Sequence, residues 1–207
     1  MENFRNELVR NYLENLDLDK SIKKFYRGRK ILVTGGAGAI GSNLSIALSQ
    51  LVGEDGMVII LDNLSAIKSD QPIDLPGLEN ILFVKGDIRN DVDLKRVFRE
   101  EPSIVFHLAA FFANQNSVDY PENSAEVDVQ GTIKTLDYAQ FTKVDKFVYA
   151  SSGCAIYGSY GEMPLKEDFI SLHLTTPYQV NKTTGEMYSN FYHHHYGLKT
   201  VNCRFFN

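Results

Sequence analysis

Cysteine is scarce in this 207-residue sequence, and long apolar runs are absent from it. The two cysteines, Cys154 and Cys203, are too few and too far apart to suggest a disulfide framework or a zinc site. No segment approaches the roughly 20 apolar residues of a membrane span. Residues 1–7 alternate charged and apolar side chains, unlike a signal peptide. We therefore expect a cytoplasmic protein without a membrane partner.

Basic residues are also in the minority, with 21 Lys and Arg against 26 Asp and Glu and a net charge of -5. This balance argues against nucleic acid as the main partner, although backbone N–H groups can still bind a small anion locally. The composition, 43% hydrophobic and 23% charged, is typical of a globular chain with one sizeable core. We find no internal repeat and no low-complexity linker.

From residue 30 onward, apolar runs alternate with segments of helical periodicity. The predicted strands are Lys30–Thr34, Met57–Leu61, Ile81–Val84, Ile104–Leu108, Lys146–Ala150 and Thr200–Arg204. The predicted helices are Ile40–Leu51, Val92–Arg99, Ser124–Phe141 and Tyr178–Tyr196. Such alternation is typical of a parallel sheet that helices cover on both faces. We predict an α/β fold, a doubly wound parallel sheet, over residues 29–207.

Residues 1–28 form a predicted N-terminal helical extension. Leu8, Tyr12, Leu13 and Leu16 recur at the spacing of one helix face. We expect a helix that packs on the domain, and a dimer contact is the alternative.

Three glycines, Gly35, Gly38 and Gly41, follow the first predicted strand and lead directly into a helix. The first permits a tight turn, the second lets a pyrophosphate approach the backbone, and the third lets helix and strand pack closely. The helix N-terminus offers free N–H donors and a partial positive charge. These glycines, with Ala39 and Ile40, are therefore candidate residues for binding a dinucleotide.

Asp62 ends the next predicted strand, 21 positions beyond Gly41. A carboxylate there can accept hydrogen bonds from both ribose hydroxyls of NAD, and it would repel the 2′-phosphate of NADP. No arginine stands beside it to compensate. Asp62 therefore favours NAD as the cofactor, and the adjacent Asn63 is a further candidate for binding it.

Tyr178 and Lys182 lie four residues apart after Pro177, which suits the first turn of a helix, and so share one helix face. A tyrosine is a poor base near neutral pH because its usual pKa is about 10. A nearby ammonium, together with a positive nicotinamide, favours the phenolate and makes it a usable general base. The pair suits removal of a hydroxyl proton while a hydride leaves the same carbon.

In this series of motifs the sequence resembles the extended short-chain dehydrogenase/reductase family, in its NAD-dependent sugar-nucleotide epimerase/dehydratase branch. The resemblance covers residues 30–207. It rests on Thr34–Gly41, Asp62, Gly86–Ile88, His107–Ala110, Val129–Thr132, Ser151–Gly158, Tyr178 with Lys182, and Arg204–Asn207. It implies a Rossmann fold.

The resemblance also implies further cofactor contacts. Asp87 would accept a hydrogen bond from the adenine amino group, and Ile88 would lie against the ring. The segment Leu108, Ala109 and Ala110 would line the cofactor cleft. Lys182 would hold the nicotinamide ribose as well as tune the tyrosine.

On the substrate side, the resemblance implies that Asn207 touches the diphosphate of a sugar nucleotide. The family places a catalytic Ser or Thr four positions before Tyr157, where this chain has Gly153. Ser152 could serve if the loop is shifted by one residue, whereas Cys154 is a poorer donor. Ser152 is thus the candidate third catalytic residue. The candidate substrate contacts are Ser152, Gly153, Cys154 and Asn207.

Two further departures bear on the reaction. Asp128 stands where the family usually has Asn. After the position of the catalytic hydroxyl, 4,6-dehydratase members carry Asp-Glu, whereas this chain has Cys154 and Ala155. Without a carboxylate there, dehydration by that route is disfavoured.

The resemblance therefore implies an NAD-dependent nucleotide-sugar epimerase, first of all a 4-epimerase that acts on a UDP-sugar through a 4-keto intermediate. The alternatives are a reductase or dehydratase on another nucleotide sugar, and a dinucleotide-binding protein without turnover. Family members continue for about another hundred residues, a domain-sized substrate lobe. We expect that lobe to be largely absent from this chain.

The expected partners are a nucleotide sugar and a second copy of the chain, since relatives often dimerise through the helices represented here by Ser124–Phe141 and Tyr178–Tyr196. A metal is not expected. His193, His194 and His195 are consecutive, so on a helix they point in different directions and do not easily share one ion.

Overall fold

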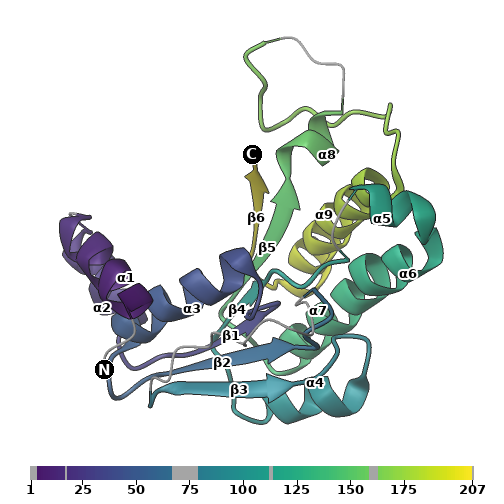
Figure 1. Cartoon of the computed structure of the whole chain (residues 1–207). Helices are drawn as coiled ribbons and strands as arrows, with labels where there is room; N and C mark the ends of the chain where they lie inside the picture. The colour runs from purple at the N-terminus through teal and green to yellow at the C-terminus, as the bar shows by residue number, and fades with distance from the viewer. Residues whose placement is uncertain (1–3, 17, 67–78, 112–113, 159–162, 207) are drawn as a thin grey trace.

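The computed structural model describes residues 4–16, 18–66, 79–111, 114–158 and 163–206. Six strands form one sheet in the order β3-β2-β1-β4-β5-β6 (Figure 1). Their bounds are β1 Lys30–Thr34, β2 Met57–Asp62, β3 Ile81–Lys85, β4 Ile104–His107, β5 Lys146–Ser152 and β6 Thr200–Phe205. All five pairings are parallel. The predicted doubly wound parallel sheet is confirmed.

The strand order changes direction at β1: β2 and β3 follow on one side of it, and β4, β5 and β6 on the other. The pairing of β1 with β2 and with β4 extends to its carboxyl end. Thr34 pairs with Leu61 on one side and with His107 on the other. In open parallel sheets, ligands bind outside the carboxyl ends of the strands at such a reversal. The fold therefore directs attention to the residues that follow β1, β2 and β4.

Helices cover both faces of the sheet (Figure 1). They are α1 Phe4–Asn15, α2 Lys20–Tyr26, α3 Ala39–Val52, α4 Asp91–Phe98, α5 Asn114–Asp119, α6 Pro121–Ala125, the π-helix η1 Glu126–Gly131, α7 Thr132–Phe141, α8 Gly153–Tyr157 and α9 Pro177–Tyr196. No helix in the described part of the chain is both long and apolar enough to cross a bilayer.

The segment Ser124–Phe141 is helical throughout, as predicted, but it includes a π-helical turn that was not predicted. The segment is α6, the wider turn η1 and α7 in succession, and Pro121 stands in the first turn of α6. A Cβ on Gly131 would lie 2.5 Å from Cδ1 of Ile88, so the end of η1 packs very closely on the chain after β3. Single π turns of this kind are frequent at functional sites.

Two apolar clusters lie on opposite faces of the sheet. Ile31 and Val33 belong to the cluster under α3, whereas Leu32 belongs to the cluster under α4, α7 and α9. Successive residues of a strand point to opposite faces, so a strand buried on both faces reads as an unbroken apolar run. This accounts for the run in β1 and for the success of the strand predictions.

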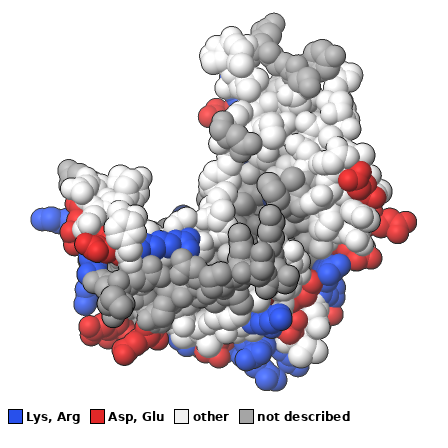
Figure 2. All heavy atoms as spheres, viewed as in Figure 1, with Lys and Arg blue, Asp and Glu red and all other residues white. Residues whose placement is uncertain are grey.

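The N-terminal segment forms two helices, and they pack against α3 (Figure 1). The predicted apolar stripe is only partly covered: Leu8 and Tyr12 are 51% and 64% exposed, whereas Leu13 is half-buried. Polar groups contribute to the contact, since Arg5 Nε donates to Asn43 Oδ1 at 3.0 Å. Figure 2 shows a surface hollowed between these helices and the wall that carries α8 and α9.

Candidate functional site

The glycine turn connects β1 to α3 through a conformation that side chains would obstruct. Gly35 has a φ of +71°, a region that favours glycine. A Cβ on Gly41 would lie 2.2 Å from the carbonyl oxygen of Gly35. The helix begins at Ala39, and its N-cap residue Gly38 has no side chain to cap the first turn. The first N–H groups of α3 therefore remain available to a ligand, beside the exposed Ala39 and Ile40.

Asp62, at the end of β2, is tied to this turn. One carboxylate oxygen accepts from the Ala37 N–H at 2.9 Å, and the other accepts from the Leu64 N–H at 2.8 Å. A carboxylate oxygen has a second lone pair, so both oxygens can still accept from a ribose. The contact also places the predicted acid directly against the predicted phosphate-binding turn.

Asp87 lies beyond β3 in a polar cluster of its own. Its carboxylate pairs with Arg89 at 2.9 Å and accepts from Asn63 Nδ2 at 2.9 Å. The hydrogen bond from Arg89 holds the pKa of Asp87 at about 2. The neighbouring Ile88 is buried in the core. An adenine contact at these two residues stays a prediction, and the Arg89 contact was not foreseen.

The segment after β4 lies against the glycine turn. A Cβ on Gly35 would lie 2.6 Å from the backbone nitrogen of Ala109. Leu108, Ala109 and Ala110 are each partly exposed. They thus lie beside the glycine turn, and a cofactor contact there stays a prediction.

His107 connects this segment to the helices through buried hydrogen bonds. Its Nδ1 lies 2.8 Å from Thr34 Oγ1, and its Nε2 lies 3.0 Å from Thr132 Oγ1. The Thr132 hydroxyl donates to the carbonyl oxygen of Asp128. Thr132 must then accept from the ring, which assigns the proton of a neutral His107 to Nε2. Burial lowers the pKa of His107 to about 3, so the ring is neutral.

Tyr178 and Lys182 project from the first turns of α9. The helix begins with a capping box between Thr176 and Gln179. Lys182 is 4% exposed, and its ammonium donates to the Ala150 carbonyl at 2.9 Å. The same nitrogen lies 5.9 Å from the centre of the Tyr178 ring. The predicted pair is thus brought together, at the carboxyl end of β5.

The surroundings of Tyr178 raise the pKa of its phenol, whereas the expected phenolate also required the charge of a nicotinamide. Burial raises the pKa of this phenol above its usual value, and a hydrogen bond with Ser152 only partly opposes the rise. The negative charge of Asp128 raises it further. The neighbouring ammonium therefore does not by itself lower the pKa of Tyr178 enough for it to act as a base near neutral pH. The positive charge of a bound ligand would have to lower that pKa further.

The loop after β5 is a short helix, α8, which was not predicted. Ser152 is its N-cap residue, and its hydroxyl lies 3.2 Å from Cys154 Sγ. A Cβ on Gly153 would lie 2.3 Å from the ring of Phe206. That ring therefore occupies the space in which a side chain at 153 would stand. Asn207 lies outside the described residues.

Glu186 and Arg204 form a buried ion pair behind this loop. Arg204 donates to both carboxylate oxygens of Glu186 at 2.9 Å, and also to the hydroxyl of Tyr157 at 3.0 Å. A bidentate pair of this kind fixes geometry as well as charge. It joins β6, α9 and α8, and the Arg204 motif was its only sequence signal.

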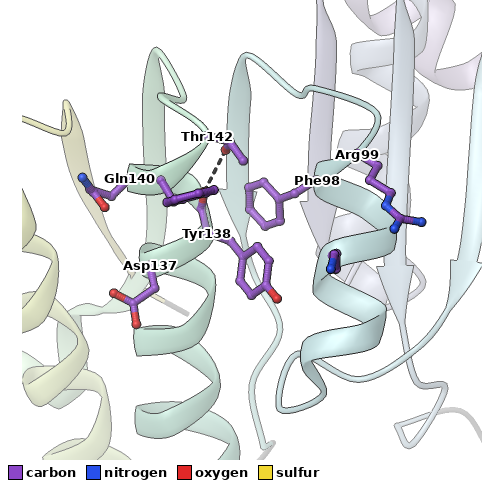
Figure 3. Close-up of a pocket in the computed structure, with 8 residues that line it drawn as sticks. Phe98, Arg99, Asp137, Tyr138, Gln140 and Thr142 are labelled. Carbon is purple, nitrogen blue, oxygen red and sulfur yellow. Dashed lines mark hydrogen bonds between the residues drawn. The ribbon is translucent and has the colours of Figure 1, made fainter.

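Two other features lie apart from this site. A cavity of about 610 Å³ between α4 and α7 is lined by Phe98, Tyr138 and Phe141 among others (Figure 3). It adjoins the helix ends that lead into β4 and β5, opposite the carboxyl edge.

In the described residues no cluster of His, Cys, Asp and Glu could hold a metal. The ring of His195 stacks on Phe191, with the ring centres 5.2 Å apart.

Comparison with known proteins gives the family. The model of the NAD dependent epimerase/dehydratase family matches residues 31–207, and the chain belongs to this family. The sequence is 36% identical to the UDP-glucose 4-epimerase of Mycolicibacterium smegmatis, over 82% of this chain and 53% of that protein. The chain thus spans about half the length of this relative.

Solved structures agree in fold. The epimerase Mth375 of Methanothermobacter thermautotrophicus has a TM-score of 0.84 and 52% identity, over 90% of this chain and 54% of that one. The UDP-glucose 4-epimerase of Thermus thermophilus, in complex with NAD, has a TM-score of 0.71 and 34% identity, over 84% of this chain and 54% of that one.

Proposed function

We propose that this member of the NAD dependent epimerase/dehydratase family binds NAD at the carboxyl edge of its sheet and catalyses 4-epimerisation of a UDP-sugar. The observation that carries the proposal is the convergence of Tyr178, Lys182 and Ser152 at the end of β5, on the same edge as the glycine turn. Two of the three similar proteins are named as UDP-glucose 4-epimerases, which supports the substrate class.

The residues present fit NAD. A Cβ on Gly38 would meet only the Gly35 oxygen at 3.4 Å, so the backbone at the start of α3 is open to a pyrophosphate. Asp62 keeps lone pairs for the ribose hydroxyls and opposes a 2′-phosphate. When bound, NAD supplies a hydride acceptor that can return the hydride to the same carbon.

Tyr178 then takes the proton of the sugar 4-hydroxyl, and Ser152 bridges the phenol and the sugar oxygen. Lys182 keeps positive charge beside the phenol, which favours its ionised form once the nicotinamide adds its own charge. In the second half of such a reaction, Tyr178 would return the proton to the same sugar oxygen, again through Ser152. Cys154 and Ala155 offer no carboxylate for a dehydration.

A dinucleotide-binding protein without turnover is the second candidate. The observation that favours it is that the ring of Phe206 lies over Gly153. Gly153 stands at the position where the family places a catalytic Ser or Thr. Ser152 has to replace that hydroxyl if the protein is an epimerase.

A homodimer and a cytoplasmic location form part of the proposal. Val180, Met187 and Phe191 are exposed along one side of α9, at a spacing that suits a helix–helix contact between two copies. Cys154 and Cys203 are both free thiols, which suits a reducing compartment. Light scattering of Phe191→Glu against the unaltered chain tests the dimer, which this charge should dissociate.

The activity is tested with NAD and a panel of nucleotide sugars, followed by product analysis. UDP-glucose and UDP-galactose should interconvert without net release of NADH. Tyr178→Phe should lower the rate by at least about a thousandfold, since it removes the proton acceptor, with NAD affinity changed by less than about threefold. Turnover that survives in this variant refutes the assigned base, and NAD binding without any turnover favours the second candidate.

A further inference from the structure

Asp128 is a carboxylate buried beside the candidate catalytic pair. It lies in η1, is 2% exposed, and one of its oxygens accepts from the Phe111 N–H at 2.7 Å. The other oxygen accepts from the Ser124 hydroxyl at 3.0 Å. Burial of a charge costs free energy unless the charge is paired and hydrogen-bonded. We therefore looked for a buried positive charge that could compensate this carboxylate.

The hydrogen bonds around Asp128 have a fixed direction. Asn181 Nδ2 donates to Ser124 Oγ at 2.9 Å, so the hydroxyl hydrogen of Ser124 is free to point to Asp128. Both carboxylate oxygens act as acceptors in this arrangement, as an ionised carboxylate does. Because Asn181 immediately precedes Lys182, the chain of contacts runs from η1 to the face of α9 that carries the candidate base.

The charge that compensates Asp128 is that of Lys182. Burial lowers the pKa of Lys182, and the negative charge of Asp128 opposes that change. Conversely, burial raises the pKa of Asp128, and the charge of Lys182 is the strongest of the influences that oppose it. Two buried opposite charges that each favour the charged form of the other titrate as a coupled pair.

The other titratable groups here lack a charge that could replace either partner. His107, on β4, is neutral, and burial raises the pKa of Tyr149, on β5, well above its usual value. Cys154, on α8, acts on Tyr178 in the same direction as Asp128. Glu186, on α9, acts on Tyr149 and is itself paired with Arg204.

We propose that Asp128 is a positioning residue for the proposed reaction, an ionised carboxylate that keeps Lys182 charged and, through Ser124 and Asn181, holds the start of α9. The inference rests on the proposed function for its role in turnover, but the charge coupling does not. Because the same negative charge opposes ionisation of Tyr178, Asp128 also sets the pH at which the base becomes active.

The first test needs no turnover. Carbon-13 NMR of the aspartate carboxyl groups, with Asp128→Asn to assign the signal, follows the titration of Asp128 in the full chain. In the unaltered protein Asp128 should be ionised at pH 7. In Lys182→Met its midpoint should rise by at least about one pH unit, since the compensating charge is gone. Ser124→Ala, which keeps both charges, should shift it by less than about half as much.

An Asp128 that is protonated at pH 7 in the unaltered chain overturns the proposal, and this measurement requires no variant to fold. A midpoint that Lys182→Met leaves within about 0.3 unit also overturns it. If Lys182→Met does not fold, the double variant with Asp128→Asn should recover folding, because it removes both charges. Failure of the double variant as well contradicts the charge coupling.

The second test is the pH profile of kcat/KM for Asp128→Asn. Its acid limb should move by at least roughly 0.5 unit: to lower pH where Lys182 stays charged, because Tyr178 then ionises more easily, and to higher pH where Lys182 loses its charge with its partner. A purely structural role would lower activity without moving the limb. If the NMR result holds and no nucleotide sugar is turned over, the proposed function fails while the coupling stands.

Discussion

The glycine turn after β1 and the side-chain cluster between β5 and α9 lie on one edge of the sheet but handle charge in different ways. In the turn the important feature is the lack of side chains: Gly35, Gly38 and Gly41 leave the backbone N–H groups at the start of α3 uncovered. The cluster works by burial, since Lys182 and Asp128 are almost fully enclosed and depend on each other. One region is sensitive to added atoms and the other to removed charges.

The largest expected effect comes from adding one carbon to the turn. In Gly41→Ala the new Cβ meets the Gly35 oxygen at 2.2 Å and the Gly36 Cα at 2.7 Å, so backbone has to move. We expect the free energy of unfolding to fall by about 3 kcal/mol or more, and NAD affinity by at least about tenfold. Urea unfolding and titration calorimetry measure the two quantities.

Gly38→Ala is the matched control for this variant. Its Cβ would lie 3.4 Å from the Gly35 oxygen, an ordinary contact. Stability should change by less than about 0.5 kcal/mol, whereas NAD affinity should fall because the methyl group stands where the pyrophosphate approaches. Equal losses of stability in the two variants would contradict the account of the turn.

The buried-charge region is tested by Glu186→Gln, which keeps the shape of the side chain but removes its charge. Arg204 is then left enclosed with neutral acceptors only, and the free energy of unfolding should fall by about 3 kcal/mol. Asp145→Asn cuts the exposed pair with Arg29 and should cost less than about 1 kcal/mol. A similar cost in both variants, measured by urea unfolding, would remove the contrast between buried and exposed pairs.

The smallest effect is expected at Asp87, a candidate cofactor contact, and it depends on pH. Its pKa in the folded chain is about 2, below the ordinary value of 3.8. Its stabilisation is therefore complete above about pH 5 and is lost as pH falls through 2. Because the pair with Arg89 is partly exposed, we expect about 1 kcal/mol.

Asp87→Asn is the variant for this measurement. It should lower the free energy of unfolding at pH 6, and the difference should be smaller at pH 2 and vanish below that pH. A difference that persists unchanged down to pH 2 would rule out the ionised carboxylate as the cause.

The same contrast explains what could be read from the sequence. The turn is local: a strand, three glycines and a helix follow one another, and Asp62 ends the next strand, so their meeting was predictable. Tyr178 and Lys182 were predictable as neighbours on one helix. Helix α8 was not, because five residues show too little periodicity.

The environment of the candidate catalytic pair, Tyr178 and Lys182, depends on contacts between distant segments. The Ser124–Asn181 hydrogen bond spans 57 positions, and the ring of Phe206 lies over Gly153 from another strand. Burial by such contacts, rather than the spacing of Tyr178 and Lys182, decides the direction of the pKa of Tyr178. Asp128 was visible in the sequence, but its role needed the partners that the π-helix η1 brings to it.

The most direct test of the central claim is titration calorimetry of the full chain with NAD and with NADP. Because Asp62 adjoins the turn and opposes a 2′-phosphate, NAD should bind at least about tenfold more tightly, and Asp62→Ala should narrow that ratio. Equal or tighter binding of NADP by the unaltered chain, or no binding of either dinucleotide, would contradict the assignment of this edge as an NAD site.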